Sequence, residues 1–252
     1  SDGHPLVLVS RNEARLKALA ESLRQDYEID VRVMPADLAV PGAVESLAER
    51  LTSEGPGIRH LVNNAGVGVY GPFGDRPWEV DQRMIQLNIT SLVGLTHLLL
   101  PSLKAGDGYR GVMNVSSTAG FQPGPLMAVY FATKAFVTSF SEALHEELRG
   151  TGVHVTAFLP GPTKTDFFTT EAMIPAGVVG PDGAVDPDAM AEYERREAKR
   201  MDAGEAARAG YEGYLMGRAM VIPGRRNQLL GMAPRLLPRQ VVRRAVHKGL
   251  RK

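Results

Sequence analysis

Cysteine is absent from the 252 residues of this sequence. Its absence excludes a disulfide framework, thiol catalysis and thiolate metal sites, and we expect no metal centre of any kind. It is compatible with a reducing compartment, and the first residues have no signal-peptide character, so we expect a cytoplasmic protein. No apolar run reaches the ~20 residues that a membrane-spanning helix needs. The longest candidate, Ile89 to Leu103, is interrupted by polar side chains.

Acidic residues are missing from the last forty positions. No Asp or Glu follows Glu212, whereas ten basic residues do, and the first 212 residues carry a net charge of −9. Such a basic segment could contact a membrane surface or nucleic acid. We favour a solvated amphipathic segment over residues 225–252, because it has no aromatic anchors and no nucleic-acid motif accompanies it. The apolar residues expected to pack inward are Leu229, Leu230, Leu236, Leu237, Val241, Val242 and Val246.

Short apolar runs alternate with segments of helical spacing along the chain. Five strands are expected, at 6–9, 31–34, 58–62, 111–115 and 153–158, with helices at 13–23, 44–51, 78–100 and 130–149. This alternation predicts a single α/β domain over residues 1–252. Its fold class is a doubly wound, Rossmann-type parallel sheet with helices on both faces.

Polar and glycine residues gather just after the predicted strands. Ligands of parallel sheets bind at the carboxyl ends of the strands, so these residues are expected at one edge. They are Arg11, Asp37, Asn64-Ala65-Gly66, Ser117 and Pro160-Gly161. Residues 167–208 break the pattern with glycine- and proline-rich turns and a charged helix near Met190–Met201. This insertion is predicted to be a substrate lid over the same edge.

Tyr130 and Lys134 are four residues apart, so on a helix both side chains project from one face. A free phenol has a pKa of ~10. A lysine ammonium one turn away is expected to lower that pKa and to suit the phenol to acid–base catalysis. The Ser117 hydroxyl could hold the oxygen that gains or loses the proton, which indicates carbonyl/alcohol interconversion. Taken alone, the same spacing is also typical of a solvated helix face.

Several further motifs stand in a fixed order around this pair. They are Asp37-Leu38, Asn63-Asn64-Ala65-Gly66, Leu87-Asn88-Ile89, Asn114-Val115-Ser116-Ser117 and Pro160-Gly161-Pro162-Thr163. In this order and spacing the sequence resembles the short-chain dehydrogenase/reductase family from Leu6 to about Asp166.

The resemblance implies a catalytic tetrad of Asn88, Ser117, Tyr130 and Lys134. Tyr130 would exchange the proton, Lys134 would lower its pKa and bind the nicotinamide ribose, and Asn88 would hold a relay water. The family's serine-to-tyrosine spacing selects Ser117 over Ser116. Ser116 as a helix cap and Asn88 as a satisfied core amide are the structural alternatives.

The resemblance also implies a nicotinamide cofactor. Asp37 and Leu38 would contact the adenine, Asn64, Ala65 and Gly66 would line the path to the pyrophosphate, and Pro160, Gly161 and Thr163 would contact the nicotinamide. Arg11 follows the strand at which an acidic residue would bind a ribose 2′-hydroxyl and an arginine a 2′-phosphate. NADP(H) is therefore favoured over NAD(H), with a solvent-facing Arg11 as the alternative.

The glycine-rich turn with which this family begins has no match in this sequence. In the doubly wound order, the first strand lies between the strands at 6–9 and 58–62, so two strand edges would be left unpaired. We expect this sequence to be part of a longer polypeptide. If it were complete, it should neither fold normally nor bind the dinucleotide well.

The favoured function is that of an NADP(H)-dependent carbonyl reductase or alcohol dehydrogenase acting on a hydrophobic ketone or secondary alcohol. The alternative is a non-catalytic or regulatory protein of the same fold that has lost its phosphate loop. The apolar residues expected near the substrate are Val69, Tyr70, Phe73, Phe121, Met127, Phe167 and Phe168. The resemblance further implies a homodimer or homotetramer through the helices that start near Trp78 and Tyr130.

Overall fold

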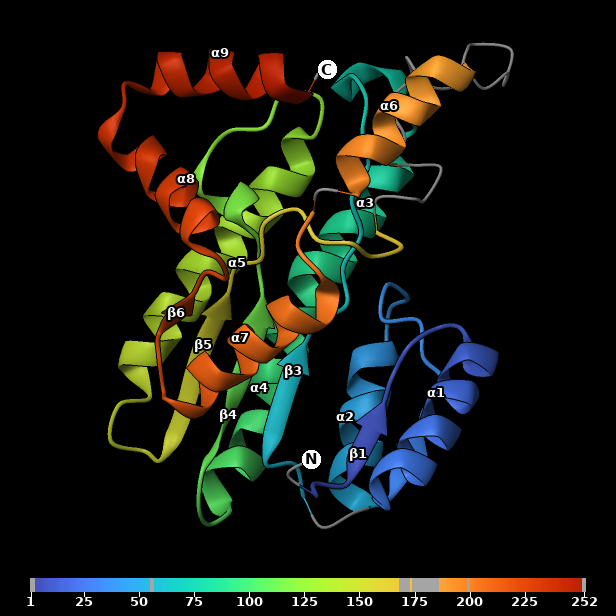
Figure 1. Cartoon of the computed structure of the whole chain (residues 1–252). Helices are drawn as coiled ribbons and strands as arrows, with labels where there is room; N and C mark the ends of the chain where they lie inside the picture. Colours follow the sequence, from blue (N-terminus) through green and yellow to red (C-terminus); the bar gives the residue numbers. More distant parts are fainter. Residues whose placement is uncertain (1–2, 55–56, 168–172, 174–185, 199, 251–252) are drawn as a thin grey trace.

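A computed structural model describes residues 3–54, 57–167, 173, 186–198 and 200–250. Strands and helices alternate through the first two thirds of the chain, as predicted (Figure 1). The elements up to the fifth strand are β1 Leu6–Leu8, α1 Glu13–Tyr27, β2 Val31–Val33, α2 Ala43–Ser53, β3 His60–Asn63, η1 Phe73–Asp75, α3 Trp78–Ile85, η2 Gln86–Thr90, α4 Ser91–Ala105, β4 Arg110–Val115, η3 Thr118–Phe121, α5 Ala128–Glu147 and β5 Val153–Phe158. Beyond it lie α6 Pro187–Glu197, α7 Ala203–Leu215, β6 Met220–Val221, α8 Arg225–Leu236 and α9 Arg239–Leu250.

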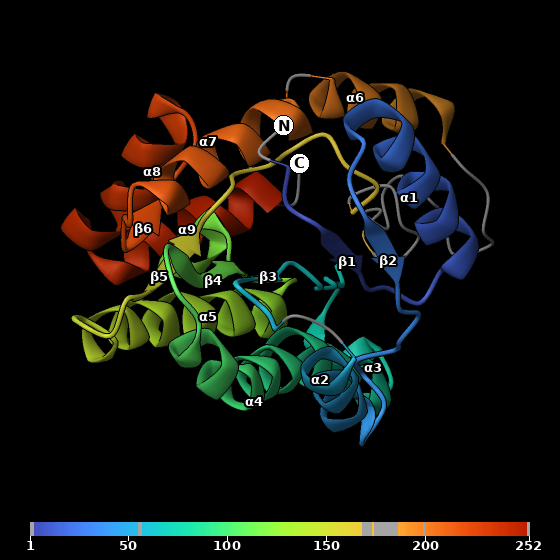
Figure 2. The same cartoon turned by 90° about the horizontal axis from the view of Figure 1, so that it is seen from below.

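All pairs of described strands are parallel, as the doubly wound fold requires. The strands form two separate sheets, β1-β2 and β3-β4-β5-β6. Figure 2 shows the two sheets side by side, with helices on both faces. The predicted Rossmann-type arrangement is therefore confirmed, although its parallel sheet is divided into two separate sheets.

β1 and β3 face one another across a cavity of about 1000 Å³. Val7 and Leu8 line it from one side, and Leu61 and Val62 line it from the other. Val62 is 51% exposed, which is unusual for a valine inside a sheet strand. The separation lies where the sequence predicts a missing strand. That the sequence is part of a longer polypeptide stays a prediction.

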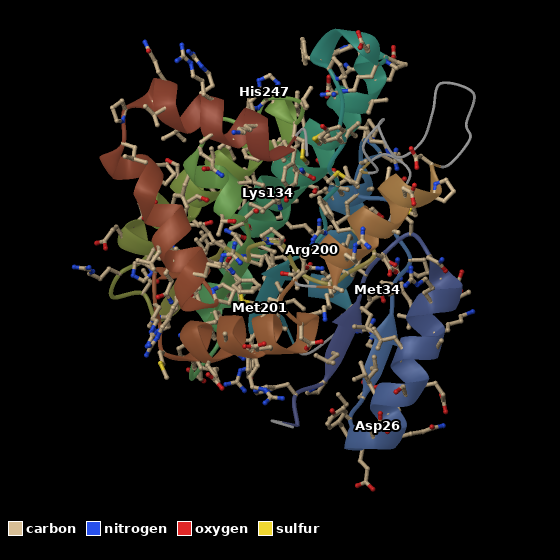
Figure 3. All side chains as sticks on the ribbon, turned by 45° about the horizontal axis from the view of Figure 1, so that its top comes forward. Asp26, Met34, Lys134, Arg200, Met201 and His247 are labelled. Carbon is tan, nitrogen blue, oxygen red and sulfur yellow. The ribbon has the colours of Figure 1, made fainter. Side chains whose placement is uncertain are left out.

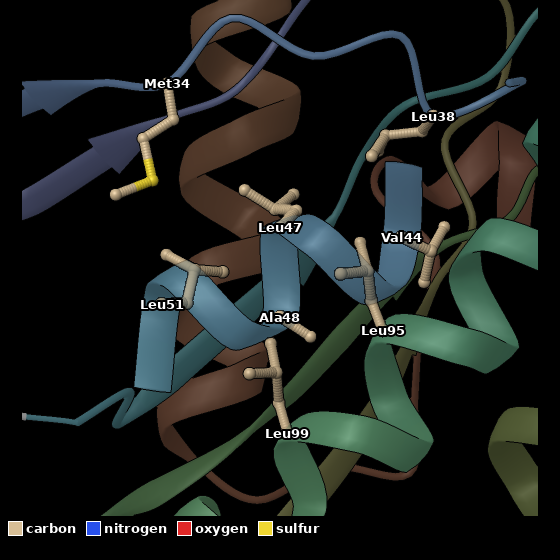
Figure 4. Packing of buried hydrophobic residues seen from close by; sticks show 8 residues of the cluster. All are labelled: Met34, Leu38, Val44, Leu47, Ala48, Leu51, Leu95 and Leu99. Atoms are coloured by element: carbon tan, nitrogen blue, oxygen red, sulfur yellow. The ribbon is translucent and has the colours of Figure 1, made fainter. Parts of the chain in front are cut away.

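The packing of α2 on α4 joins the two sheets (Figure 4). Leu47, Ala48 and Leu51 share one face of α2, because residues three and four apart are neighbours on a helix. They meet Leu95 and Leu99, which are four residues apart on α4. Burying these side chains supplies the hydrophobic stabilisation that holds the β1-β2 half against the rest.

The helix predicted from Trp78 extends to Ala105 with one irregular turn. That turn is the π-helix η2, which contains Asn88. By length and composition Trp78–Ala105 could cross a membrane. Leu99 and Leu103 of this helix are fully buried in the core, and 39% of its apolar window is buried inside the molecule.

The last quarter of the chain contains the elements least visible in the sequence. α7 covers β5 and β6, and Gly213 allows the approach, because a Cβ atom there would lie 2.3 Å from Val221. The predicted lid over 167–208 remains a prediction, since 168–172, 174–185 and 199 lie outside the described residues. Its last residues begin α7, where Ala206 is buried in the core.

The inward packing predicted for the C-terminal segment is only partly correct. Val242 is buried and Val246 is half-buried, as expected. Leu229, Leu237 and Val241 are 73%, 49% and 51% exposed, so the prediction is wrong for them. α9 offers only one stripe of positions to the core, and Val241 lies on its other side. Leu230 and Leu236 lie outside the described side chains.

Candidate active site

Tyr130 and Lys134 lie one turn apart on α5, and both are buried, with 9% and 5% exposure. α5 packs against β4, β5 and η3, so this face of the helix points into the molecule. Figure 3 labels Lys134 near the middle of the molecule, among the side chains of several elements. The predicted common face is confirmed, and the alternative of a solvated helix face is excluded.

Ser117 connects the ends of two strands to Tyr130. Its hydroxyl oxygen accepts the backbone N–H of Ala119 at 3.1 Å and thereby caps η3. The same hydroxyl donates to the carbonyl oxygen of Pro160 at 3.4 Å, just after β5. The Ser117 hydroxyl also lies close enough to the Tyr130 phenol to lower its pKa. The serine, the phenol and the predicted nicotinamide loop thus meet at one edge of the sheet.

The predicted lowering of the Tyr130 pKa is wrong for this structure. Burial of the phenol raises the pKa of Tyr130 to about 12, although the hydrogen bond with Ser117 acts in the opposite direction. The ammonium of Lys134 lies 5.9 Å from the centre of the tyrosine ring and donates instead to the carbonyl oxygen of Val115 at 2.8 Å. Desolvation therefore outweighs the opposing effect of the Ser117 hydroxyl.

Lys134 is also affected by its burial. Desolvation lowers the pKa of Lys134 to about 8. A Cβ atom built on Gly66 would lie 3.4 Å from its ammonium nitrogen and 3.3 Å from the side-chain oxygen of Asn88. The glycine thus keeps the route between Lys134 and the cavity free of a side chain.

The sequence left two structural alternatives open, Ser116 as a helix cap and Asn88 as a satisfied core amide, and the structure treats them differently. Ser116 is buried, and its hydroxyl donates to the carbonyl oxygen of Lys134 at 2.7 Å, so it anchors α5 and caps no helix. Asn88 has the contacts of a satisfied core amide. Its oxygen accepts the N–H of Val67, and its nitrogen donates to Val67 and to the hydroxyl of Thr133. The relay role of Asn88 stays a prediction.

Six of the residues predicted to bind cofactor line the cavity between the two sheets. They are Arg11, Asp37, Leu38, Asn64, Ala65 and Gly66. Arg11 is exposed, and Leu38 also packs into the core cluster of α2. The six residues predicted to bind the cofactor, which come from both sheets, thus surround one space. Chemically they fit the adenosine end of a phosphorylated dinucleotide, with one guanidinium, one carboxylate and a glycine backbone.

Asp37 has a partner that the sequence did not indicate. Arg83 of α3 donates to its carboxylate at 2.5 Å, and the backbone N–H of Ala39 donates at 3.1 Å. Desolvation raises the pKa of Asp37, but the hydrogen bonds from Arg83 and Ala39 outweigh it and leave the pKa below its ordinary value. Asp37 and Arg83 are 46 positions apart in the sequence, so no local pattern indicates this contact.

The loop after β5 is held from two sides. The Thr163 hydroxyl donates to the carbonyl oxygen of Gly161 at 2.9 Å. A Cβ atom on Gly161 would lie 2.5 Å from the side chain of Asn227, the α8 residue against which this glycine rests. Sequence reasoning missed Asn227 because it lies 66 positions later in the chain, in a segment with no recognisable motif.

Apolar side chains surround the ring of Tyr130. Phe167 lies 5.5 Å from it between ring centres, and Met173 packs in the same cluster. Val69, Tyr70, Met127 and Phe167 join this cluster as predicted. Phe73 is exposed, Phe121 contacts Gly231 of α8 instead, and Phe168 lies outside the described residues. In the described part of the chain, no group of three or more His, Asp or Glu residues could hold a metal ion.

The chain is similar to known proteins in both sequence and structure. A family model described as short chain dehydrogenase matches residues 1–173. Sulfoacetaldehyde reductase 2 of Chromohalobacter salexigens is 38% identical over 166 residues, which cover 66% of this chain and 65% of that protein. Very-long-chain 3-oxoacyl-CoA reductase of Homo sapiens is 35% identical over 163 residues, which cover 63% of this chain and 51% of that protein. The match thus spans between 51% and 65% of the length of these two relatives.

Solved structures agree over more of the chain. A short-chain dehydrogenase from Sphingobium yanoikuyae in complex with NADPH has a TM-score of 0.74 and 32% identity, and the match covers 93% of this chain and 85% of that one. A bulky-bulky ketone specific alcohol dehydrogenase from Comamonas testosteroni has a TM-score of 0.71 and 28% identity, and the match covers 93% of this chain and 84% of that one.

Proposed function

Because this chain belongs to the short-chain dehydrogenase family, we propose that it transfers a hydride between NADP(H) and a hydrophobic ketone or secondary alcohol. The observation that carries the proposal is the buried Tyr130 between the Ser117 hydroxyl and the Lys134 ammonium. A carbonyl reduction needs one proton at the oxygen and one hydride at the carbon. The cofactor, when bound, would supply or accept the hydride.

The side chains of this protein would handle the proton. A phenol with a pKa of about 12 stays protonated at neutral pH and can donate to a carbonyl oxygen as negative charge develops there. The Ser117 hydroxyl would donate a hydrogen bond to the same oxygen and fix its position. At neutral pH the phenol is almost entirely in its protonated form, which is the form that carbonyl reduction needs, so we propose that the site is suited to reduction.

Lys134 would hold the nicotinamide ribose in place and take part in returning a proton to the site. Its ammonium lies behind Gly66, which lines the cavity, and from there it would hold the hydroxyls of the nicotinamide ribose. Asn88, in the π-helical turn, would hold the water that returns a proton to Lys134. π-helical turns are frequent at functional sites because they shift a side chain out of the regular helical register.

The proposed preference for NADP(H) rests on Arg11. Its side chain is exposed at the cavity, and its charge helps to keep the Asp37 carboxyl ionised. A guanidinium binds a phosphate through two parallel hydrogen bonds, whereas a ribose hydroxyl gains less from it. The structural relative from Sphingobium yanoikuyae was solved with NADPH, which supports the same choice.

The proposed substrate is apolar near its carbonyl group. Tyr130 is flanked by Phe167, Met173 and Val69, which offer dispersion contacts and few hydrogen-bond partners. The relative from Comamonas testosteroni is specific for bulky-bulky ketones, which is consistent with this class. Sulfoacetaldehyde and 3-oxoacyl-CoA, the substrates in the names of the curated relatives, are also carbonyl compounds.

We further propose a homodimer or homotetramer through α4 and α5. Phe136 of α5 and Leu98 of α4 are exposed although both are large and apolar. Phe136 stacks on Phe140, with 6.0 Å between ring centres. Covering this aromatic pair in a subunit interface would remove apolar surface from water.

The test is NADPH oxidation against a panel of ketones with three matched variants. Tyr130→Phe and Ser117→Ala should each lower kcat by about 10²-fold or more, because general acid catalysis contributes on that scale. Ser116→Ala serves as the control. It removes a buried anchoring bond and should cost about 1 kcal/mol of stability while kcat stays within a few-fold.

A Tyr130→Phe protein as active as the parent would refute the mechanism. If no ketone in the panel is reduced and NADPH also fails to raise the melting temperature, the non-catalytic alternative is favoured, because a true cofactor must stabilise the folded state.

A further inference from the structure

The surface of α8 and α9 combines exposed basic and exposed apolar side chains. We call this surface the α8–α9 face. It comprises the exposed residues Arg225, Arg226, Leu229, Leu237, Arg239, Val241, Arg243, Arg244 and Lys248. Figure 1 shows the two helices meeting at a corner on the outside of the molecule. Leu237 lies at that corner, and Val241 follows within one turn, since its N–H donates to the carbonyl oxygen of Pro238.

α9 is fixed on the body of the protein by its opposite side. Val246 and Leu250, four residues apart, pack into the apolar cluster that contains Tyr130. The hydroxyl of Tyr70 donates to the carbonyl oxygen of Leu250 at 2.7 Å. The outward side presents Val241, Arg244 and Lys248, which lie on one stripe because they are spaced three and four residues apart.

The charges of the α8–α9 face are unbalanced. None of its basic side chains forms an ion pair with another residue in the described part of the chain. The sequence supplies no Asp or Glu after Glu212 that could neutralise them locally. Surface arginines elsewhere, such as Arg15 and Arg149, do have carboxylate partners. The face therefore lacks an anionic partner of its own.

The sequence favours a solvated amphipathic segment here, but Leu229, Leu237 and Val241 are exposed instead of packed inward. We therefore propose that the α8–α9 face binds an anionic membrane surface. Exposed leucine and valine can enter the boundary between headgroups and acyl chains, while flanking arginine and lysine contact lipid phosphates. A nucleic acid or a free anion would use the cations and leave the apolar side chains in water. A second copy presenting the same face would set like charges opposite one another, which is unfavourable.

This placement goes beyond the proposed reaction and does not depend on it. α9 is one helix thick, ~10 Å. A membrane against its outer side would thus lie within about that distance of the apolar cluster around Tyr130. An apolar substrate dissolved in the lipid would have a short path to the site.

The test is sedimentation of the purified protein with vesicles at 0.1 M salt. We expect binding to phosphatidylglycerol/phosphatidylcholine vesicles and at least tenfold weaker binding to phosphatidylcholine alone. Arg244→Gln combined with Lys248→Gln should weaken binding to the anionic vesicles about 30-fold, since each cation near such a surface contributes about fivefold. Leu237→Ser combined with Val241→Ser should weaken it at least tenfold.

Matched controls distinguish this surface from exposed residues in general. Leu19 of α1 is 48% exposed, close to Leu237, so Leu19→Ser should leave binding within twofold. Arg149→Gln with Arg218→Gln removes two exposed cations outside the α8–α9 face and should behave likewise.

Three results would overturn the proposal. One is no binding to anionic vesicles, and another is an equal loss in the control variants. The third is a change of mass in light scattering for the Leu237→Ser/Val241→Ser protein without any change in vesicle binding, which would make the face an interface between copies.

Discussion

At the scale of single residues, burial shifts the pKa values of Tyr130 and Lys134 in opposite directions. The phenol keeps its proton more strongly, and the ammonium loses its proton more easily, because a low-dielectric interior disfavours both charged forms. Lys134 has one compensating bond, to the carbonyl oxygen of Val115. Desolvation of these two groups therefore lowers the stability of the folded protein whenever one of them is charged, and the size of this effect depends on pH.

Stability should rise with pH through the titration of Lys134. Its folded pKa of about 8 lies below its ordinary value of 10.5, so between these values the unfolded chain binds more protons than the folded one. The free energy of unfolding of the parent should therefore increase relative to Lys134→Met between pH 7.5 and pH 10, by at most about 1.4 kcal/mol per pH unit. Urea denaturation of both proteins across this range measures the difference.

Lys134→Arg is the matched control, because arginine keeps its charge throughout the range. The parent should gain stability with pH relative to this variant as well. A difference between parent and Lys134→Met that does not change with pH would contradict the assignment of a depressed lysine pKa.

At the scale of elements, helix ends and helix irregularities position the site. The π-helical turn η2 carries Asn88, and the short helix η3 begins at Ser117. α7 covers the sheet next to the loop after β5, and its first turn is capped by Asp202. The backbone N–H of Lys164 bonds to the carbonyl oxygen of Met201, directly before that cap. The start of α7 is thus tied to the loop that carries Thr163.

Asp202→Ala should lower stability by about 1 kcal/mol, because the carboxylate accepts the free N–H groups of Gly204 and Glu205 at the helix start. For a domain of this size that loss corresponds to a drop of about 2–4 °C in melting temperature. Calorimetry measures it. Asp202→Asn keeps a cap of similar strength and should stay within about 1 °C of the parent. Equal losses in both variants would show that the charge, and not the cap, is responsible.

At the scale of the whole molecule, the residues proposed to bind the cofactor are divided between two sheets. Arg11 and Asp37 follow the strands of the smaller sheet, and Asn64 and Gly66 follow β3 of the larger one. The two halves are joined mainly through α2 and α4. A ligand that contacts both halves would add a second connection between them and should stabilise the fold as a unit.

NADPH should therefore raise the melting temperature more than NADH does. At 100 times its dissociation constant, a ligand of the folded state adds about 2.7 kcal/mol. Arg11→Gln should remove most of the NADPH shift and leave the NADH shift unchanged, because only the 2′-phosphate needs the guanidinium. Differential scanning fluorimetry measures both, with Arg149→Gln as the control. Equal shifts by the two cofactors would refute the proposed preference.

The sequence by itself determined the features that depend on local geometry. The four-residue spacing of Tyr130 and Lys134 fixed their common helix face, since a helix repeats every 3.6 residues. The order of strands and helices fixed the parallel sheet, and the carboxyl ends of the strands fixed the edge at which Ser117 and Pro160 meet. These relations hold wherever the elements form.

Only the tertiary structure decided the features that depend on distant parts of the chain. The pKa of Tyr130 rises because side chains from several elements exclude water from it, which no spacing along α5 could reveal. Arg83 contacts Asp37, which lies 46 positions earlier in the chain. Leu237 and Val241 remain exposed because the rest of the fold covers only one side of α9. Burial and long-range contact are properties of the assembled molecule, and they set the charge state of this site and the character of its outer surface.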